Sequence, residues 1–119
     1  MNEKMSYGFY VELFIRRIRT FLRRKKIEGS VLTQLEYDIL FLIEKMGHNI
    51  TVKELQGAFI GFLNLQPKLT SLGDKLRYLQ EKGYVNSEIC TQAHRPAVIW
   101  SLTHGGEELF EKEKNLRKK

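Results

Sequence analysis

The sequence contains few cysteines, prolines and tryptophans: one cysteine, two prolines and one tryptophan in 119 residues. The single cysteine, Cys90, excludes a disulfide within the chain and favours a reducing compartment. No apolar run approaches the roughly 20 residues that cross a bilayer, and the N-terminus lacks the charged, apolar and small-residue order of a signal peptide. We therefore expect a cytoplasmic protein that does not enter a membrane.

The sequence also lacks the motifs of catalysis. It has no nucleophile with a base at motif spacing, no glycine-rich phosphate loop and no cluster of metal ligands. His48, His94 and His104 are too scattered to form a site, and we expect His48 to be an exposed turn residue. These absences predict a protein that is not an enzyme and binds no metal or cofactor.

Positive charge is concentrated at one end of the chain. The length fits a single domain, residues 1–119, and the formal net charge is +6. Residues 1–30 hold eight Lys and Arg against three Glu, whereas the remaining residues are nearly neutral. The excess would attract an acidic polymer or an acidic surface to the N-terminal segment.

Residues 8–27 have the pattern of a basic amphipathic helix. Its apolar stripe comprises Val11, Phe14, Ile15, Ile18, Phe21 and Leu22. The rest of its circumference is mostly basic, with Arg16, Arg17, Arg19, Arg23, Arg24 and Lys26. Such a helix can lie on an anionic membrane, dock its stripe on the domain or on a second subunit, or contact phosphates. We expect docking, with a basic face that is solvated or contacts phosphates.

Two capping boxes predict the starts of the next two helices. Thr33 with Glu36 and Thr51 with Glu54 have the required spacing. We expect the first helix to end near residue 46, before Gly47. The second should bury its apolar positions, which are Val52, Leu55, Ala58, Phe59, Phe62 and Leu63.

Residues 66–85 predict an amphipathic helix that leads into a strand. Its apolar stripe is formed by Leu69, Leu72, Leu76 and Leu79. Pro67 suits the first turn, and Gly83 suits a left-handed C-cap. The polar side of the helix presents Thr70, Ser71, Asp74 and Tyr78, with Lys68 and Lys75 on one flank.

A hairpin and a final helix are predicted after Gly83. Residues 84–91 and 97–103 read as strands, and the segment between them carries His94, Arg95 and Pro96. Alternation of Val98, Trp100 and Leu102 indicates that one face of the hairpin packs on the helices. Cys90 lies on the first strand, where we expect a structural role, with redox sensing as the alternative. Residues 105–119 form the last helix.

This order, mainly α with a small β-hairpin (α+β), is that of a winged helix-turn-helix over residues 33–103. In that architecture helix 67–82 enters the major groove of DNA, and the wing at 91–97 reaches the minor groove or the backbone. Asp74 fits poorly, because DNA repels a carboxylate unless it accepts from a cytosine amine or pairs with Arg77. The expected DNA contacts are Gln66, Lys68, Thr70, Ser71, Lys75, Tyr78, His94, Arg95, Arg16 and Arg17.

Residues 32–112 resemble the MarR-type winged-helix regulators, and the short length is similar to the SarA-like branch of that group. The resembling segments are LTQLEYDILFLI, TVKEL, KLTSLGDKLRYLQEKGYV and VIWSLTHGGEELFEK. The resemblance implies a homodimer that binds specific double-stranded DNA as a transcriptional regulator at the nucleoid, with Ser71 in the recognition helix and Arg95 as the wing arginine. It also implies a small-molecule effector pocket, although no residue identifies a ligand.

The chain departs from that family in three places. His94 stands where an aspartate normally precedes the wing arginine, and extra residues lie within AFIGFLNLQ. The C-terminal helix is short, so we expect the apolar stripe of residues 8–27 to form the dimer interface. Two alternatives to a regulator remain: a plasmid or phage protein of replication, partition or conjugation, and a winged-helix module that binds protein. The near-neutral charge of residues 31–119 favours the protein-binding module.

Overall fold

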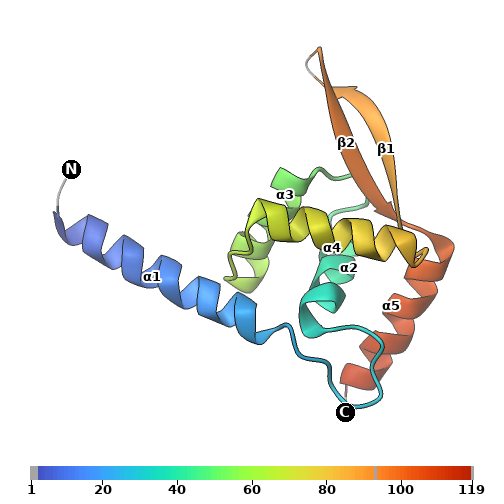
Figure 1. Ribbon diagram of the computed structural model, residues 1–119, viewed down its shortest axis with the longest axis horizontal. Coiled ribbons are helices and arrows are strands. Elements are labelled where there is room, and N and C mark those ends of the chain that lie inside the picture. The colour runs from blue at the N-terminus through green and yellow to red at the C-terminus, as the bar shows by residue number, and fades with distance from the viewer. Residues whose placement is uncertain (1–2, 93, 119) are drawn as a thin grey trace.

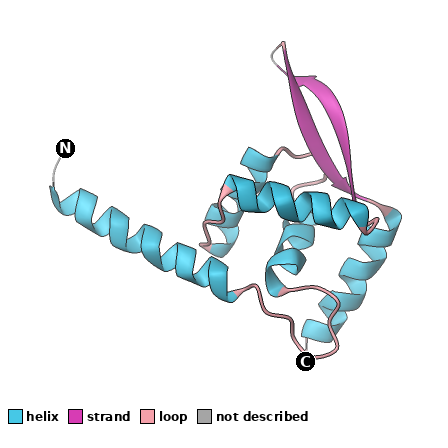
Figure 2. Ribbon diagram, viewed as in Figure 1, coloured by secondary structure: helices cyan, strands magenta, loops and turns pink. Residues whose placement is uncertain are grey.

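The computed structural model describes residues 3–92 and 94–118, without the side chains of residues 3–7, 9 and 92. Within these residues the elements are α1 (Glu3–Leu22), α2 (Gln34–Lys45), α3 (Val52–Ala58), the π-helix η1 (Phe59–Leu63), α4 (Leu69–Glu81), β1 (Val85–Gln92), β2 (Arg95–Leu102) and α5 (His104–Arg117). The elements α2 to α5 form one body, and α1 extends away from it (Figure 1; Figure 2). The predicted fold class, mainly α with a small hairpin, is confirmed.

The helix α2 lies in the middle of the body, behind α4 in Figure 1. Both predicted capping boxes are present: Thr33 caps α2 with Glu36, and Thr51 caps α3 with Glu54. Apolar residues on several sides of α2 are fully buried, namely Leu35, Ile39, Leu40, Leu42 and Ile43. Because this helix is apolar around most of its circumference, other elements can pack against it from several directions.

The segment after α3 differs from the prediction of one continuous helix. It widens into the π-helix η1, which ends at Asn64 in the left-handed conformation with φ 53°. A π turn accommodates extra residues inside a helix. Phe59 stays fully buried, but Phe62 is turned outward, and Lys45 Nζ lies 5.1 Å from the centre of its ring. The expectation that Phe62 is buried is therefore wrong.

The helix α4 starts two residues later than predicted. Lys68 is its N-cap, and Pro67 precedes the helix, where its carbonyl accepts a hydrogen bond from Gln56 Nε2 at 2.9 Å. Leu72, Leu76 and Leu79 are fully buried, whereas the predicted fourth member of the stripe, Leu69, is exposed. The predicted turn at Gly83 is present, with φ 85°. A positive φ of this size favours glycine.

The hairpin is longer, and its turn tighter, than predicted. The antiparallel pairing runs from Val85 opposite Leu102 to Gln92 opposite Arg95. Trp100, toward the base of the hairpin, is buried. Val98 is exposed because the strands continue beyond the body (Figure 1). Val98 was expected to face the helices, and this expectation is wrong. Cys90 is also exposed, so the structure does not support a packing role for it.

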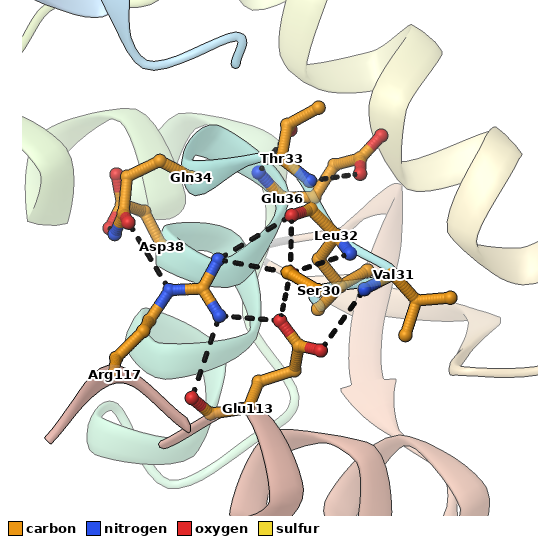
Figure 3. A network of polar contacts seen from close by, with 9 residues as sticks. All are labelled: Ser30, Val31, Leu32, Thr33, Gln34, Glu36, Asp38, Glu113 and Arg117. Carbon is orange, nitrogen blue, oxygen red and sulfur yellow. Dashed lines mark hydrogen bonds and ion pairs between the residues drawn. The ribbon is translucent and has the colours of Figure 1, made fainter. Parts of the chain in front are cut away.

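The helix α5 closes the body opposite α3. Phe110 is buried, and its ring stacks on Tyr37 of α2 with ring centres 5.4 Å apart. Figure 3 shows the carboxylate of Glu113 beside the hydroxyl of Ser30 and the guanidinium of Arg117, and both groups donate to it. Val31 N–H donates to the same carboxylate at 3.2 Å. These bonds attach the segment between α1 and α2 to α5.

The helix α1 ends earlier than its sequence pattern predicted. It stops at Leu22 instead of continuing to residue 27. The carbonyl of Arg23 accepts from Leu35 N–H at 2.7 Å, and that of Lys25 accepts from Gln34 N–H at 3.0 Å. These bonds pair the segment after Leu22 with the start of α2, in place of a further helical turn. No helix among the described residues is both long enough and apolar enough to cross a bilayer.

Candidate nucleic-acid interface

The helix α4 presents a polar face to solvent. The side opposite its three buried leucines exposes Thr70, Asp74, Arg77, Tyr78 and Glu81. Asp74 forms an ion pair with Arg77, which is one of the two roles predicted for it. The middle of this face is therefore almost neutral. It offers hydroxyl groups rather than unpaired cations to a partner.

One flank of α4 is held by an ion pair that the sequence pattern did not reveal. Lys75 was expected to contact a DNA phosphate, but its Nζ lies 2.9 Å from Oε2 of Glu36. Glu36 is buried and also completes the capping box of α2. Lys75 and Lys82 both lie beside the ring of Tyr78, at 5.8 and 5.6 Å from its centre. Part of the charge and one donor of Lys75 are therefore already used by Glu36.

Several of the expected contact residues gather where α1 ends and α4 begins. A hollow of about 230 Å³ is lined there by Arg17, Gln66, Lys68 and Ser71, among others. The backbone N–H of Gln66 donates to Thr20 Oγ1 at 3.1 Å, and the Thr20 hydroxyl donates to the carbonyl of Arg16 at 2.8 Å. This pair of bonds fixes the end of α1 beside the start of α4.

Two other arginines near this hollow form hydrogen bonds with side chains of the same chain. Arg16 Nε donates to Asn64 Oδ1 at 2.8 Å, so part of its bonding capacity is used on the connector before α4. Arg23 Nη2 donates to Oδ1 of the buried Asp38 at 2.9 Å, and this hydrogen bond raises the pKa of Arg23. The sequence pattern placed Arg23 on the solvated face of the N-terminal helix. Its real position depends on the end of α1 at Leu22, which no local pattern marks.

The tip of the hairpin carries the remaining expected contacts. Arg95 and His94 are exposed there, and His94 has φ 65°. Residue 93, within the predicted wing, lies outside the described residues. The tip extends well beyond the body (Figure 1). The structure therefore presents two separate groups of candidate contacts, with the solvent face of α4 between them.

The structure also brings together His48, Glu44 and Glu107, which sequence spacing did not connect. His48 is in a turn as predicted, with φ 70°, but it is half-buried rather than exposed. Its Nδ1 accepts from Leu102 N–H at 3.2 Å, and Nε2 lies 3.6 and 3.8 Å from the two carboxylates. A neutral ring that accepts at Nδ1 carries its proton on Nε2, the atom that a metal would need. This arrangement joins α2, β2 and α5 and does not suit a metal ion.

No protein-family model and no curated protein matches the chain. Solved structures do match it. FabT of Streptococcus pneumoniae in complex with DNA aligns with a TM-score of 0.58 and 21% identity, over 98% of this chain and 73% of that one. The fold is a winged helix.

Two further winged-helix neighbours align over about two thirds of the chain. PadR of Bacillus subtilis in complex with operator DNA aligns with a TM-score of 0.59 and 18% identity, over 66% of this chain and 45% of that one. MarR of E. coli in its apo form aligns with a TM-score of 0.56 and 26% identity, over 67% and 53%. The chain therefore spans about half the length of these two proteins. The structural resemblance to MarR-type winged-helix proteins is confirmed.

Proposed function

We propose that this winged-helix protein is a homodimer that binds specific double-stranded DNA and regulates transcription, without enzymatic activity. The observation that supports this most is the placement of α4 and the hairpin. The hairpin leaves the C-terminal end of α4 and extends away from the body, with Arg95 at its tip (Figure 1). A helix fits the major groove, which is about 12 Å wide, and a projecting arginine reaches the adjacent minor groove. FabT and PadR were both solved in complex with DNA.

The polar residues of α4 have distinct roles in this proposal. Thr70, Ser71 and Tyr78 offer hydroxyl groups to bases or phosphates, and Lys68 offers a cation to the backbone. Arg77 offsets the charge of Asp74, which removes much of the repulsion expected from that carboxylate. Lys75 contributes less than an unpaired lysine, because Glu36 already offsets its charge. Specificity would therefore come from hydroxyl groups on α4, and affinity from cations around it.

The homodimer is supported by the apolar face of α1. All six stripe residues are exposed in the single chain, including Phe14 at 64% and Phe21 at 66%. A 20-residue helix is about 30 Å long, and a second copy offers an identical stripe that can cover it through a twofold contact. Such a dimer would place two α4 helices about one DNA turn apart and would require a pseudo-palindromic site. Tandem repeats near a replication origin would instead favour a plasmid or phage maintenance protein.

The test is binding of the purified protein to random duplex DNA over a series of salt concentrations, followed by selection of preferred sequences. We expect salt-sensitive binding that resolves into two half-sites. Arg95→Ala should lower the salt slope by about one unit, since one phosphate or minor-groove contact is lost. Lys112→Ala, an exposed residue on α5, is the matched control and should leave the slope unchanged.

A second candidate function is a winged-helix module that binds another protein. The nearly neutral solvent face of α4 favours it, because many DNA-binding domains are more basic than this. Absence of DNA binding even at low salt would contradict the DNA proposal and favour this one.

A further inference from the structure

The hollow between the end of α1 and the start of α4 gathers cations without an acidic partner. Arg17, Arg24 and Lys68 line it, and no carboxylate is among its lining residues. Within residues 3–92 and 94–118, neither Arg17 nor Lys68 has an ion pair or a hydrogen bond through its side chain. Three cations that line one hollow with no carboxylate in its lining attract an anion to this position, although Arg24 also lines the adjoining hollow that includes Asp74.

The neighbouring cations are different because they already bind groups in the chain. Arg23 is paired with Asp38, and Lys75 is paired with Glu36. Arg24 has a contact of another kind: its guanidinium carbon lies 5.7 Å from the centre of the Phe21 ring. Stacking on a ring uses the face of a guanidinium and leaves the N–H groups along its edge free to donate. This contact with the ring uses none of the N–H groups of Arg24 as a hydrogen-bond donor.

The size of the hollow indicates what kind of anion it suits. Its volume of about 230 Å³ is below the roughly 300–1,000 Å³ of most small-molecule pockets. A single phosphate group with a few waters, each taking about 30 Å³, fits such a space. The hydroxyl of Ser71 lines it, and the positive end of the α4 dipole adds to the attraction. A phosphate in this position would lie beside the polar face of α4.

We propose that this hollow holds one phosphate of the DNA backbone, so that the DNA footprint extends from α4 to the end of α1. Arg24 joins Arg17 and Lys68 as a contact in this arrangement. The inference rests on the proposed function, because it assumes that α4 enters a groove of DNA. It adds a backbone contact to the helix that is also proposed to form the dimer, so the dimer geometry would set where that phosphate must lie.

The experiment compares two double variants with the same loss of charge in the same segment. Arg17→Gln with Arg24→Gln removes two cations from the hollow. Arg19→Gln with Lys25→Gln removes two cations that line a different hollow, beside Leu63. Both are made in the full chain, their folding is checked by circular dichroism, and their affinity for the selected duplex is measured across a salt series. Phosphate-ethylation interference then locates the backbone contacts.

We expect the first variant to lower the salt slope by about one unit and to lose one interference position beyond the contacts of α4 and the hairpin. The second variant should retain that position. Equal loss in the two variants would overturn the inference, since the charges would then act only at long range.

Inorganic phosphate is titrated as a further probe. Tight binding of free phosphate that the first variant loses, with its DNA contacts unchanged, would also overturn it. Failure of the wild-type protein to bind DNA would instead contradict the proposed function itself.

Discussion

The body of the molecule and its N-terminal helix differ in what they bury and what they expose. In the body, each buried carboxylate is paired with a cation: Glu36 and Asp38 with one from another segment of the chain, and Glu113 with Arg117 one turn further along α5. In α1, Thr20 is the one buried side chain among those described, at 6% exposed, and a whole apolar stripe faces solvent. The buried charges of the body are therefore neutralised within the chain, whereas the apolar stripe of α1 is exposed in the single chain, where our proposal has a second copy cover it.

The difference shows how much each region depends on a partner. Buried ion pairs hold elements in one arrangement, because breaking such a pair leaves an uncompensated charge. An exposed apolar stripe holds no elements together in the single chain. It contributes to stability only when another surface covers it and removes it from water. The predictions below test this contrast by their effect on the free energy of unfolding of the single chain.

The largest effect is expected where α5 meets the start of the hairpin. A Cβ on Gly106 would lie 1.9 Å from the carbonyl oxygen of Tyr84, so Gly106→Ala requires the backbone to move. We expect a loss of about 4 kcal/mol or more, because overpacking that side chains alone cannot relieve exceeds the usual cost. Gly105→Ala is the control, since its Cβ would meet ordinary contacts at 3.6 Å and beyond. Urea unfolding measures both, and similar stabilities would show that the close approach is not required.

A smaller effect is expected from Glu113, which pairs with Arg117 on α5 and binds Ser30 and Val31 in the segment before α2. Burial by itself raises the pKa of Glu113, but hydrogen bonds from Ser30, Arg117 and Val31 N–H outweigh it and hold that pKa below its ordinary value of 4.5. Glu113→Gln should cost about 3 kcal/mol at neutral pH, because it leaves Arg117 without its charge partner.

The pH dependence of that loss has a definite sign. A carboxyl whose pKa is lowered by folding stabilises the protein above its unfolded pKa, and this contribution disappears as pH falls through the folded value. The stability difference between wild type and Glu113→Gln should therefore shrink as pH falls below 4.5. Glu111→Gln, exposed on the same helix, should show no such trend. A difference that stays constant into acid would contradict the charge-based account.

The sequence predicted the features of the body that depend on local patterns. Both capping boxes and the turn at Gly83 are set by residues within a few positions of each other, and all are present. The end of α1 and the π turn at η1 could not be predicted in this way. Directly after α1, the carbonyl of Arg23 accepts from Leu35 N–H, a bond between residues that only the tertiary fold brings together.

The candidate interface was predictable to a similar extent. Periodicity identified the polar face of α4 and the basic tip of the hairpin, and the Asp74–Arg77 pair was one of the two roles foreseen for Asp74. The pairing of Lys75 with Glu36, 39 residues earlier, was missed because no spacing rule links them. The convergence of Arg24 on the hollow was missed for the same reason. The DNA contacts themselves stay predictions.

A moderate effect is expected at the partly buried hydrogen bond between Thr20 of α1 and Gln66, which precedes α4. Thr20→Val keeps the shape of the side chain but removes the hydroxyl that accepts from Gln66 N–H. We expect a loss of about 1 kcal/mol and faster hydrogen exchange at the Gln66 amide. Thr20→Ser keeps the hydroxyl and should preserve the protection. Unchanged exchange in Thr20→Val would mean that this bond does not hold α1 beside α4.

The smallest effect on the single chain, and the largest on assembly, is expected from Phe14→Gln with Phe21→Gln. Both rings are exposed, so their removal should change the stability of the monomer by no more than about 0.5 kcal/mol. In a dimer the same rings would be covered, so sedimentation should show a wild-type dimer and a monomeric variant. The wild-type Tm should also rise with protein concentration, whereas that of the variant should not. Phe62→Gln removes a ring that is also exposed, but outside α1, and should leave the dimer intact. A variant that still dimerises would place the interface elsewhere, and the apolar face of α1 would then need a different partner.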